Sequence, residues 1–264
     1  MEKLIDKQRV ADSFSKAATS YDSVAELQRE IGSELINRLP HKTVDRVLDL
    51  GCGTGYFTPL LRDKYPHAVL INLDLAEGML SYARNNRYDA NAHWLCADAE
   101  SLPIADNSVD LIFSSLAIQW CENTKQLFAE LLRVLRPGGQ FVVATLGPET
   151  LFELKNAWQA VDSFTHVNKF LSRELFLEAC PNGLSLESFH EAYKVLRYNQ
   201  LKELTDELKR LGAHNMNAGQ QTGLTGRERI RRFKSAYEAQ RDAQGFLPAT
   251  YQVFYVVFQK QTQD

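Results

Sequence analysis

The sequence contains few cysteines and no long apolar run. Its four cysteines are scattered, with no Cys-x-x-Cys pair, so neither a disulfide framework nor a zinc site is indicated; they are Cys52, Cys96, Cys121 and Cys180. No stretch reaches the ~20 apolar residues that span a bilayer, and the N-terminus lacks the apolar core of a signal peptide. The formal net charge of −3 gives no general case for binding nucleic acid or a membrane surface. These absences predict a cytoplasmic protein without a metal, a nucleic-acid partner or a membrane anchor.

What the sequence does have is the composition of a packed globular protein. Of its 264 residues, 44% are hydrophobic, which argues against wholesale disorder. The length fits one large domain, or a core domain with an insertion. Neither an internal repeat nor a low-complexity tract is present.

The most informative stretch is a glycine-rich turn that follows an apolar run. Residues 44–50 are predicted to form a buried parallel strand, because too few of them are polar for one face to meet water. An acid stands near the end of this run and three glycines follow on alternate positions: Asp49, then Gly51, Gly53 and Gly55. A dinucleotide-binding turn would need its third glycine where Tyr56 stands. The acid also favours a cationic ligand over a phosphate.

Acids stand at or just past the ends of two further predicted strands. The apolar run 69–74 ends in Asp74, close to the ~20-residue separation expected between a glycine turn and a ribose-binding acid. A carboxylate there can accept from both ribose hydroxyls, although it could instead cap the following helix. Asp98 follows the short strand 93–96, and a fourth strand is predicted over 109–115. Strands that alternate with helices predict a parallel sheet.

This pattern resembles the class I S-adenosylmethionine-dependent methyltransferases. The resemblance implies a Rossmann-like α/β fold, with a seven-stranded, mostly parallel sheet and an antiparallel C-terminal strand. It also implies S-adenosylmethionine as cofactor and S-adenosylhomocysteine as product. In that family the position of Asp98 accepts from the adenine amino group, and the N–H of Ala99 donates to the ring. The residues expected at the cofactor, of which Met79 is also explained by core packing, are Asp49, Gly51, Cys52, Gly53, Gly55, Asp74, Leu75, Met79, Asp98, Ala99 and Ser115.

Helical segments are predicted outside the core. Residues 1–40 have apolar positions at helical spacing, and 14–22 within them either pack on the domain or cover the cofactor and touch the substrate. A leucine stripe predicts a helix over 201–211, and a basic helix follows it. We therefore predict an N-terminal lid segment (1–40), a cofactor-binding core (41–197 and 248–264) and a helical insertion (198–247). The basic positions of this insertion are Arg227, Arg229, Arg231, Arg232 and Lys234.

The whole chain is similar to the malonyl-acyl-carrier-protein O-methyltransferases of biotin biosynthesis. The similarity lies in residues 14–22, 115–121, 201–215 and 249–251, all outside the widely shared glycine motif. It implies methyl transfer to the free carboxylate of a malonyl thioester, with malonyl-acyl carrier protein as partner and malonyl-coenzyme A as a further possible acceptor. An acidic carrier would suit the basic helix, which an ordinary solvated face explains equally well.

Three residues are candidates for positioning the substrate carboxylate. They are Tyr21, Gln119 and His214, with Arg197 as a further option and a surface-loop role as the alternative for His214. A carboxylate is already ionised at pH 7, so we assign no general base. Two other functions stay open. One is methyl transfer to a quinone precursor or a small free acid such as trans-aconitate, and the other is a scaffold or sensor that binds the cofactor without turnover.

Overall fold

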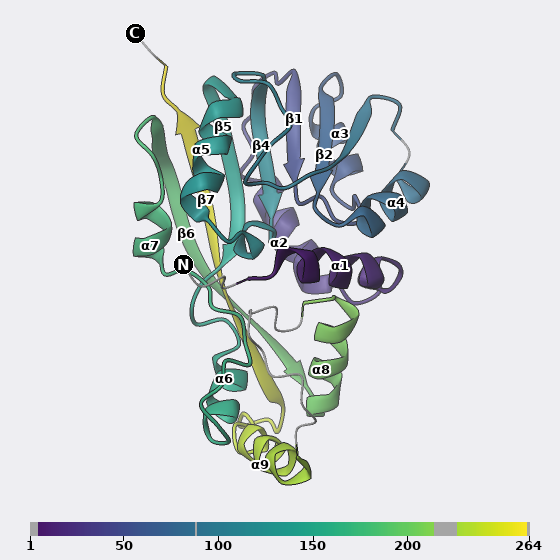
Figure 1. Ribbon diagram of the computed structural model, residues 1–264, viewed down its shortest axis with the longest axis vertical. Coiled ribbons are helices and arrows are strands. Elements are labelled where there is room, and N and C mark those ends of the chain that lie inside the picture. Colours follow the sequence, from purple (N-terminus) through teal and green to yellow (C-terminus); the bar gives the residue numbers. More distant parts are fainter. Residues whose placement is uncertain (1–4, 88, 214–225, 263–264) are drawn as a thin grey trace.

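The structure, a computed structural model, describes residues 5–87, 89–213 and 226–262 and is built around one seven-stranded sheet (Figure 1). The strand order is β3-β2-β1-β4-β5-β7-β6. Only β7 runs antiparallel to its neighbours, which confirms the predicted mostly parallel sheet with an antiparallel C-terminal strand. The strands are β1 (Arg46–Leu50), β2 (Val69–Asp74), β3 (Ala92–Cys96), β4 (Val109–Ser115), β5 (Leu135–Leu146), β6 (Leu184–Tyr198) and β7 (Leu247–Lys260).

Helices cover both faces of this sheet, because its central strands are apolar on both sides. Neighbouring residues of β1 belong to different clusters, Val47 to the core on one face and Leu48 to the core on the other. Both are fully buried. The core helices are α2 (Glu26–Ile36), α3 (Thr58–Lys64), α4 (Glu77–Asn86), α5 (Thr124–Val134), α6 (Phe152–Gln159) and α7 (Arg173–Glu178), with a 3-10 turn at Ile118–Trp120.

Two strands extend further than the sequence predicts. The sequence Pro137-Gly138-Gly139 is typical of a turn before a strand from Gln140, but β5 already begins at Leu135, which pairs with Val109 across a register shift. Gly138, with φ of +74°, lets the strand pass through the irregularity. The imperfect alternation of residues 184–193 indicates a strand that ends at Tyr193, but β6 continues to Tyr198, because its partner β7 offers pairing positions as far as Leu247.

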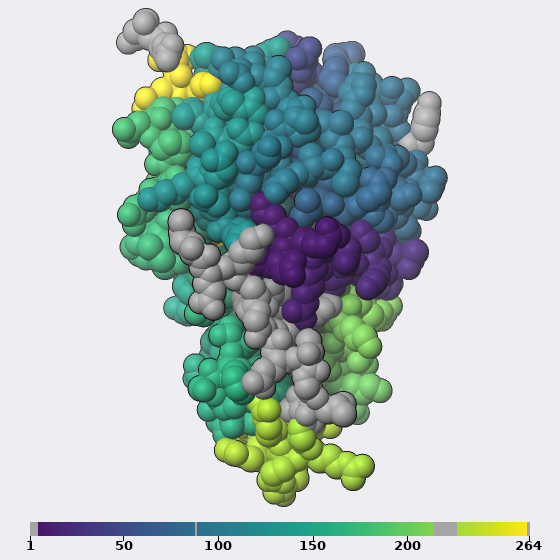
Figure 2. All heavy atoms as spheres, in the orientation of Figure 1, coloured from purple at the N-terminus to yellow at the C-terminus, as the bar shows by residue number. Residues whose placement is uncertain are grey.

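The first helix, α1 (Lys7–Tyr21), crosses the ends of the strands instead of lying on a face of the sheet. Figure 1 shows it between the parallel part of the sheet and the lower helices, and Figure 2 shows its atoms across the middle of the molecule. Asp6 caps α1 by accepting from the N–H of Arg9. The helix packs chiefly against α4. This position brings one side of α1 to the edge of the sheet where the predicted ligand residues gather.

The insertion contains the two predicted helices, α8 (Leu201–Arg210) and α9 (Arg227–Glu238). The leucine stripe of α8 turns inward, and Gly212, with φ of +72°, follows the end of the helix. The hydroxyls of Ser13 and Ser20 on α1 donate to the carbonyls of Gly212 and Arg210, at 3.1 and 3.0 Å. α9 packs on α6 at the far end of the molecule (Figure 1). No helix among the described residues is long and apolar enough to cross a membrane.

Candidate active site

A cavity opens at the carboxyl ends of β1, β2 and β4, and α1 closes one side of it. This is the edge at which open α/β sheets bind ligands. Eight of the eleven residues predicted at the cofactor line the cavity: Gly51, Gly53, Asp74, Leu75, Met79, Asp98, Ala99 and Ser115. The structure therefore brings together strand ends that lie up to 64 positions apart in the chain (Gly51 to Ser115).

The glycine turn needs its glycines for two different reasons. At Gly51, φ is +75° and a Cβ would lie 2.1 Å from the Cβ of Ala117, so only glycine fits beside the cavity. At Gly55, φ is +70° and a Cβ would lie 2.8 Å from the ring of Trp94. Gly55, Asp49 and Cys52 do not line the cavity. They shape the turn from behind.

Asp74 holds the glycine turn against the start of α4. Its two carboxylate oxygens accept from the backbone N–H groups of Gly53, at 2.9 Å, and Ala76, at 2.8 Å. Burial raises the pKa of this carboxyl, while the backbone hydrogen bonds act in the opposite direction. Each oxygen keeps a lone pair that a ligand hydroxyl could use. Asp74 thus partly caps α4, as the alternative interpretation predicts, and its oxygens can still accept further hydrogen bonds.

Two buried polar groups around this cavity lack hydrogen-bond partners in the described part of the chain. One is Oδ2 of Asp49 and the other is Oγ of Ser115. Burial, with a further contribution from Asp74, raises the pKa of Asp49 to about 8. Unpaired buried polar groups are costly, so the unpaired hydroxyl of Ser115, which lines the cavity, indicates a missing polar ligand. Asp49 stands behind the glycine turn without a cation, where a positively charged group bound in the turn would favour its ionised form.

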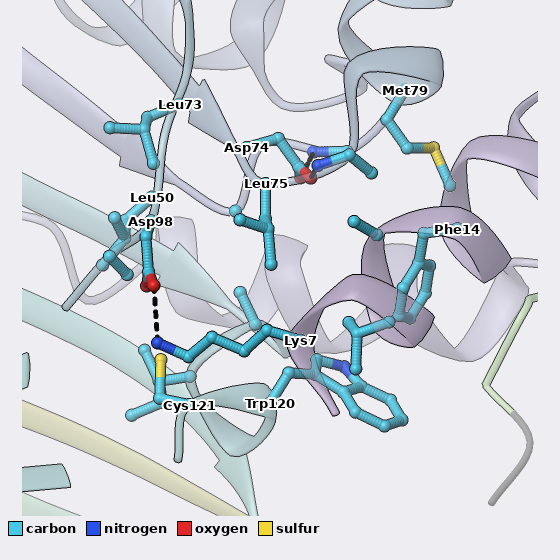
Figure 3. Close-up of a pocket in the computed structure, with 18 of the residues that line it drawn as sticks. Lys7, Phe14, Leu50, Leu73, Asp74, Leu75, Met79, Asp98, Trp120 and Cys121 are labelled. Atoms are coloured by element: carbon cyan, nitrogen blue, oxygen red, sulfur yellow. Dashed lines mark hydrogen bonds and ion pairs between the residues drawn. The ribbon is translucent and has the colours of Figure 1, made fainter. Parts of the chain in front are cut away.

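Lys7 lines the cavity, although it is not among the residues predicted there. Its ammonium group lies 2.6 Å from Asp98 and 2.9 Å from Glu100. Figure 3 shows the lysine reaching across the lower side of the cavity to Asp98. The same face of α1 presents Val10 and Phe14 to the cavity. Spacing of three and four residues along 7–14 is the signal that could have predicted this lining face.

A second cavity adjoins the first. Four residues line both: Phe14, Tyr21, Leu116 and Trp120. The rings of Phe14 and Trp120 meet edge to face with centroids 5.3 Å apart, and Figure 3 shows them side by side. Leu116 has φ of +53°, a strained conformation for a residue with a side chain, and such strain often marks functional sites. The two cavities therefore meet at a shared aromatic wall.

The residues predicted to position the substrate differ in where they lie. Tyr21 lines both cavities, and burial, followed by Asp74 and Asp22, raises its pKa, so its phenol stays protonated. Gln119 lines only the second cavity of these two, where its amide donates to the carbonyl of Leu116 at 2.7 Å. His214 lies outside the described residues. Arg197 lines neither cavity; it is half exposed and pairs with Asp242 at 2.9 Å, so it is not placed to clamp a carboxylate there.

The five basic residues of α9 do not form one free surface. Arg229 pairs with Asp162, and Arg232 donates to the carbonyl of Ala160 at 2.7 Å. Arg231 pairs with Glu228 on its own helix. Arg227 and Lys234 are exposed, and neither has an ion pair with any described residue. Two of the five thus anchor the helix, and two are free for a partner.

Comparisons with known proteins agree with this geometry. Residues 48–143 match the family model described as "Methyltransferase domain". The chain is 42% identical over 257 residues to a malonyl-[acyl-carrier protein] O-methyltransferase of Hahella chejuensis, covering 97% of this chain and 91% of that protein. It is 52% identical over 258 residues to the biotin biosynthesis bifunctional protein BioHC of Cellvibrio japonicus, covering 97% of this chain. The chain spans about half the length of that relative (51%).

Solved structures agree on the fold. The YcgJ protein of Bacillus subtilis superimposes with a TM-score of 0.64 at 19% identity, covering 89% of this chain and 100% of that protein. At this identity the likeness concerns the fold alone. A putative methyltransferase of Bacillus halodurans gives a TM-score of 0.61 at 18% identity, covering 88% of this chain and 99% of that one.

Proposed function

Because the chain belongs to the family of malonyl-[acyl-carrier protein] O-methyltransferases, we propose that it methylates the free carboxylate of a malonyl thioester. The methyl donor is S-adenosylmethionine, the acceptor is malonyl-acyl carrier protein, and the reaction is an early step of biotin synthesis. S-adenosylhomocysteine and the malonyl methyl ester are the products. The reaction makes the protein a carboxyl O-methyltransferase.

The observation that carries this proposal is the meeting of the two cavities. In the first cavity, Asp74 would accept from the ribose and Asp98 from the adenine, while the glycine turn and the unpaired groups behind it would take up the amino acid end. The sulfonium would then lie toward Phe14, Tyr21, Leu116 and Trp120, which line both cavities. An acyl chain in the second cavity would bring its carboxylate to the same wall.

This arrangement suits a reaction that needs positioning more than acid–base catalysis. The sulfonium of the cofactor supplies an already activated methyl group, and the malonyl carboxylate is ionised at pH 7 without help. The protein has to hold the carboxylate oxygen in line with the methyl group and keep water away. Tyr21 contributes a protonated phenol at the shared wall, and the apolar side of α1 covers it. Gln119, held by Leu116, supports the same wall from the second cavity.

The carrier protein would dock beside α9. Acyl carrier proteins are acidic, and opposite charges accelerate encounter between partners. Arg227 and Lys234 are the exposed basic residues of α9 that no described acid neutralises. They are therefore better candidates for the carrier contact than Arg229 and Arg232, which the fold itself uses. We also propose that α1 and α8, which are hydrogen-bonded to each other, move together as a lid over the site.

Methyl transfer from labelled S-adenosylmethionine tests the proposal directly. The acceptors are malonyl-acyl carrier protein, malonyl-coenzyme A, the free carrier and trans-aconitate. We expect a base-labile methyl ester, formed fastest on the malonyl carrier. Faster transfer to trans-aconitate would replace the proposed function with a small-acid methyltransferase. Cofactor binding without transfer to either malonyl thioester would overturn the proposed activity.

A further inference from the structure

The second cavity contains two buried polar groups that no described residue satisfies. They are Oε1 of Gln28, on α2, and the hydroxyl of Tyr251, on β7. Tyr251 is buried, with 5% of its surface exposed. Two other polar groups of this cavity are already engaged. His166 bonds to Asp162 at 2.8 Å, and the hydroxyl of Thr150 donates to the carbonyl of Gln252. Two unmet groups in one cavity indicate a ligand that meets both.

The charges around Tyr251 decide what kind of ligand fits. Burial, followed by Glu207, Tyr237 and Glu153, raises the pKa of its phenol, so the hydroxyl stays protonated and can donate. Glu207 and Glu153 disfavour an anion at Tyr251 itself, while Lys209 is the cation that lines this cavity. The amide of Gln28 is neutral and can present either its oxygen or, after a half turn, its NH2 group. This end of the cavity is therefore suited to an uncharged acceptor, and not to a carboxylate.

We propose that Gln28 and Tyr251 bind an uncharged carbonyl of the acyl-thioester arm and so set the substrate's register in the second cavity. This inference rests on the proposed function, because the arm is that of a malonyl thioester. The carboxylate goes to the wall shared with the first cavity, where the cationic sulfonium would attract it. The neutral carbonyls further along the arm go to Gln28 and Tyr251. A substrate bound in the opposite orientation would place its carboxylate near Glu207 and Glu153.

Removal of the polar atoms of one side chain at a time provides the test. Tyr251→Phe and Gln28→Leu keep the volume of each side chain and remove its polar atoms. A hydrogen bond to a neutral group is worth roughly 0.5–1.5 kcal/mol, so we expect kcat/KM for malonyl-acyl carrier protein to fall about two- to tenfold in each variant. The dissociation constant of S-adenosylmethionine should not change. The thermal stability of Tyr251→Phe should be equal to or above that of the wild type, because the hydroxyl is unsatisfied in the free protein.

Tyr255→Phe is the matched control. Tyr255 lies four residues further along β7, is also buried and lines neither cavity, and its hydroxyl faces Glu34. Its loss should leave kcat/KM for the acceptor unchanged. Equal losses in Tyr251→Phe and Tyr255→Phe would mean general damage to the core and would overturn the assignment. So would unchanged acceptor kinetics in both Tyr251→Phe and Gln28→Leu.

A second acceptor locates the carbonyl. S-malonyl-N-acetylcysteamine keeps the thioester and one amide of the pantetheine arm. If the variants lose activity equally on this acceptor and on the malonyl carrier, the contact lies in the shared part. A loss confined to the carrier assigns it to the more distant amide. A wild-type protein that methylates neither acceptor would overturn the proposed function itself, and this inference with it, which the variants alone would not do.

Discussion

The two cavities differ in the charge of the ligand groups that they suit. The first is lined by two acids, Asp74 and Asp98, and a third acid, Asp49, is buried behind its glycine turn without a cation. The second is mainly apolar, and the unsatisfied groups that face it are the neutral Gln28 and Tyr251. A cationic cofactor on one side and a substrate whose charge sits at one end on the other would meet at the shared wall. The fold therefore meets charged ligand groups in the first cavity and at the shared wall, and the neutral chain of the substrate in the second cavity.

The largest expected effect follows from filling the glycine turn. Gly51→Val places a side chain where φ is +75° and where a Cβ would lie 2.1 Å from that of Ala117. Left-handed strain of ~1–2 kcal/mol and overpacking of ~1–3 kcal/mol together predict an affinity for S-adenosylmethionine that is about 100-fold weaker. Calorimetric titration measures it. Gly245→Ala, with φ of +84° and open space around it, is the control and should bind the cofactor normally.

Asp49, which is buried behind the glycine turn, should make the stability of the protein depend on pH. Native Asp49, with a pKa raised to about 8, keeps its proton while the unfolded carboxyl, near 3.8, releases it. The native state therefore binds more protons between these values, and its stability falls as pH rises from about 4 to about 8. Asp49→Asn removes this loss, so its melting temperature should exceed that of the wild type by a margin that grows toward pH 8, reaching at least ~2–4 °C.

The exposed Asp63 provides the comparison for this experiment, since Asp63→Asn should change the melting temperature equally at pH 5 and pH 8. If the difference between Asp49→Asn and the wild type is the same at both pH values, the carboxyl of Asp49 is not held protonated. The proposed cation site would then lose its strongest electrostatic support.

A smaller effect is expected on the side of the carrier protein. Arg227→Glu combined with Lys234→Glu should raise KM for malonyl-acyl carrier protein about tenfold at low salt, because opposite charges at the rim steer encounter. KM for S-malonyl-N-acetylcysteamine should stay the same. The double reversal Arg46→Glu and Lys125→Glu changes the net charge equally at exposed positions elsewhere and should leave both constants unchanged. If both double reversals raise KM for malonyl-acyl carrier protein equally, α9 is not the docking site.

The smallest effect concerns the link between α1 and the cofactor cavity. Lys7→Met breaks the ion pairs with Asp98 and Glu100. Two partly exposed pairs contribute on the order of 1 kcal/mol together, so the affinity for S-adenosylmethionine should fall about fivefold. Arg84→Met, which breaks the exposed pair with Glu77, should change it less than twofold. Tighter binding by Lys7→Met would show that the lysine competes with the cofactor for Asp98.

The two cavities also differ in how far the sequence predicts them. Successive parallel strands end at one edge of the sheet, so the spacing of Gly51, Asp74 and Asp98 predicts that they meet. The second cavity needs contacts that no local pattern records, because Gln28 and Tyr251 are 223 positions apart and meet only when β7 returns between β5 and β6. The pairing of Arg229 with Asp162 depends on the same long-range packing. The sequence therefore shows that the α9 region is basic. It does not show which of these basic residues pair with other parts of the fold.

A crystal structure with S-adenosylhomocysteine and a stable malonyl thioester analogue tests the central claim most directly. We expect the sulfur of the cofactor product at the wall formed by Phe14, Tyr21, Leu116 and Trp120, with the malonyl carboxylate beside it. The acyl arm should leave through the second cavity, with its carbonyls toward Gln28 and Tyr251. A carboxylate bound at Gln28 and Tyr251, or an acyl arm outside the second cavity, would contradict the account.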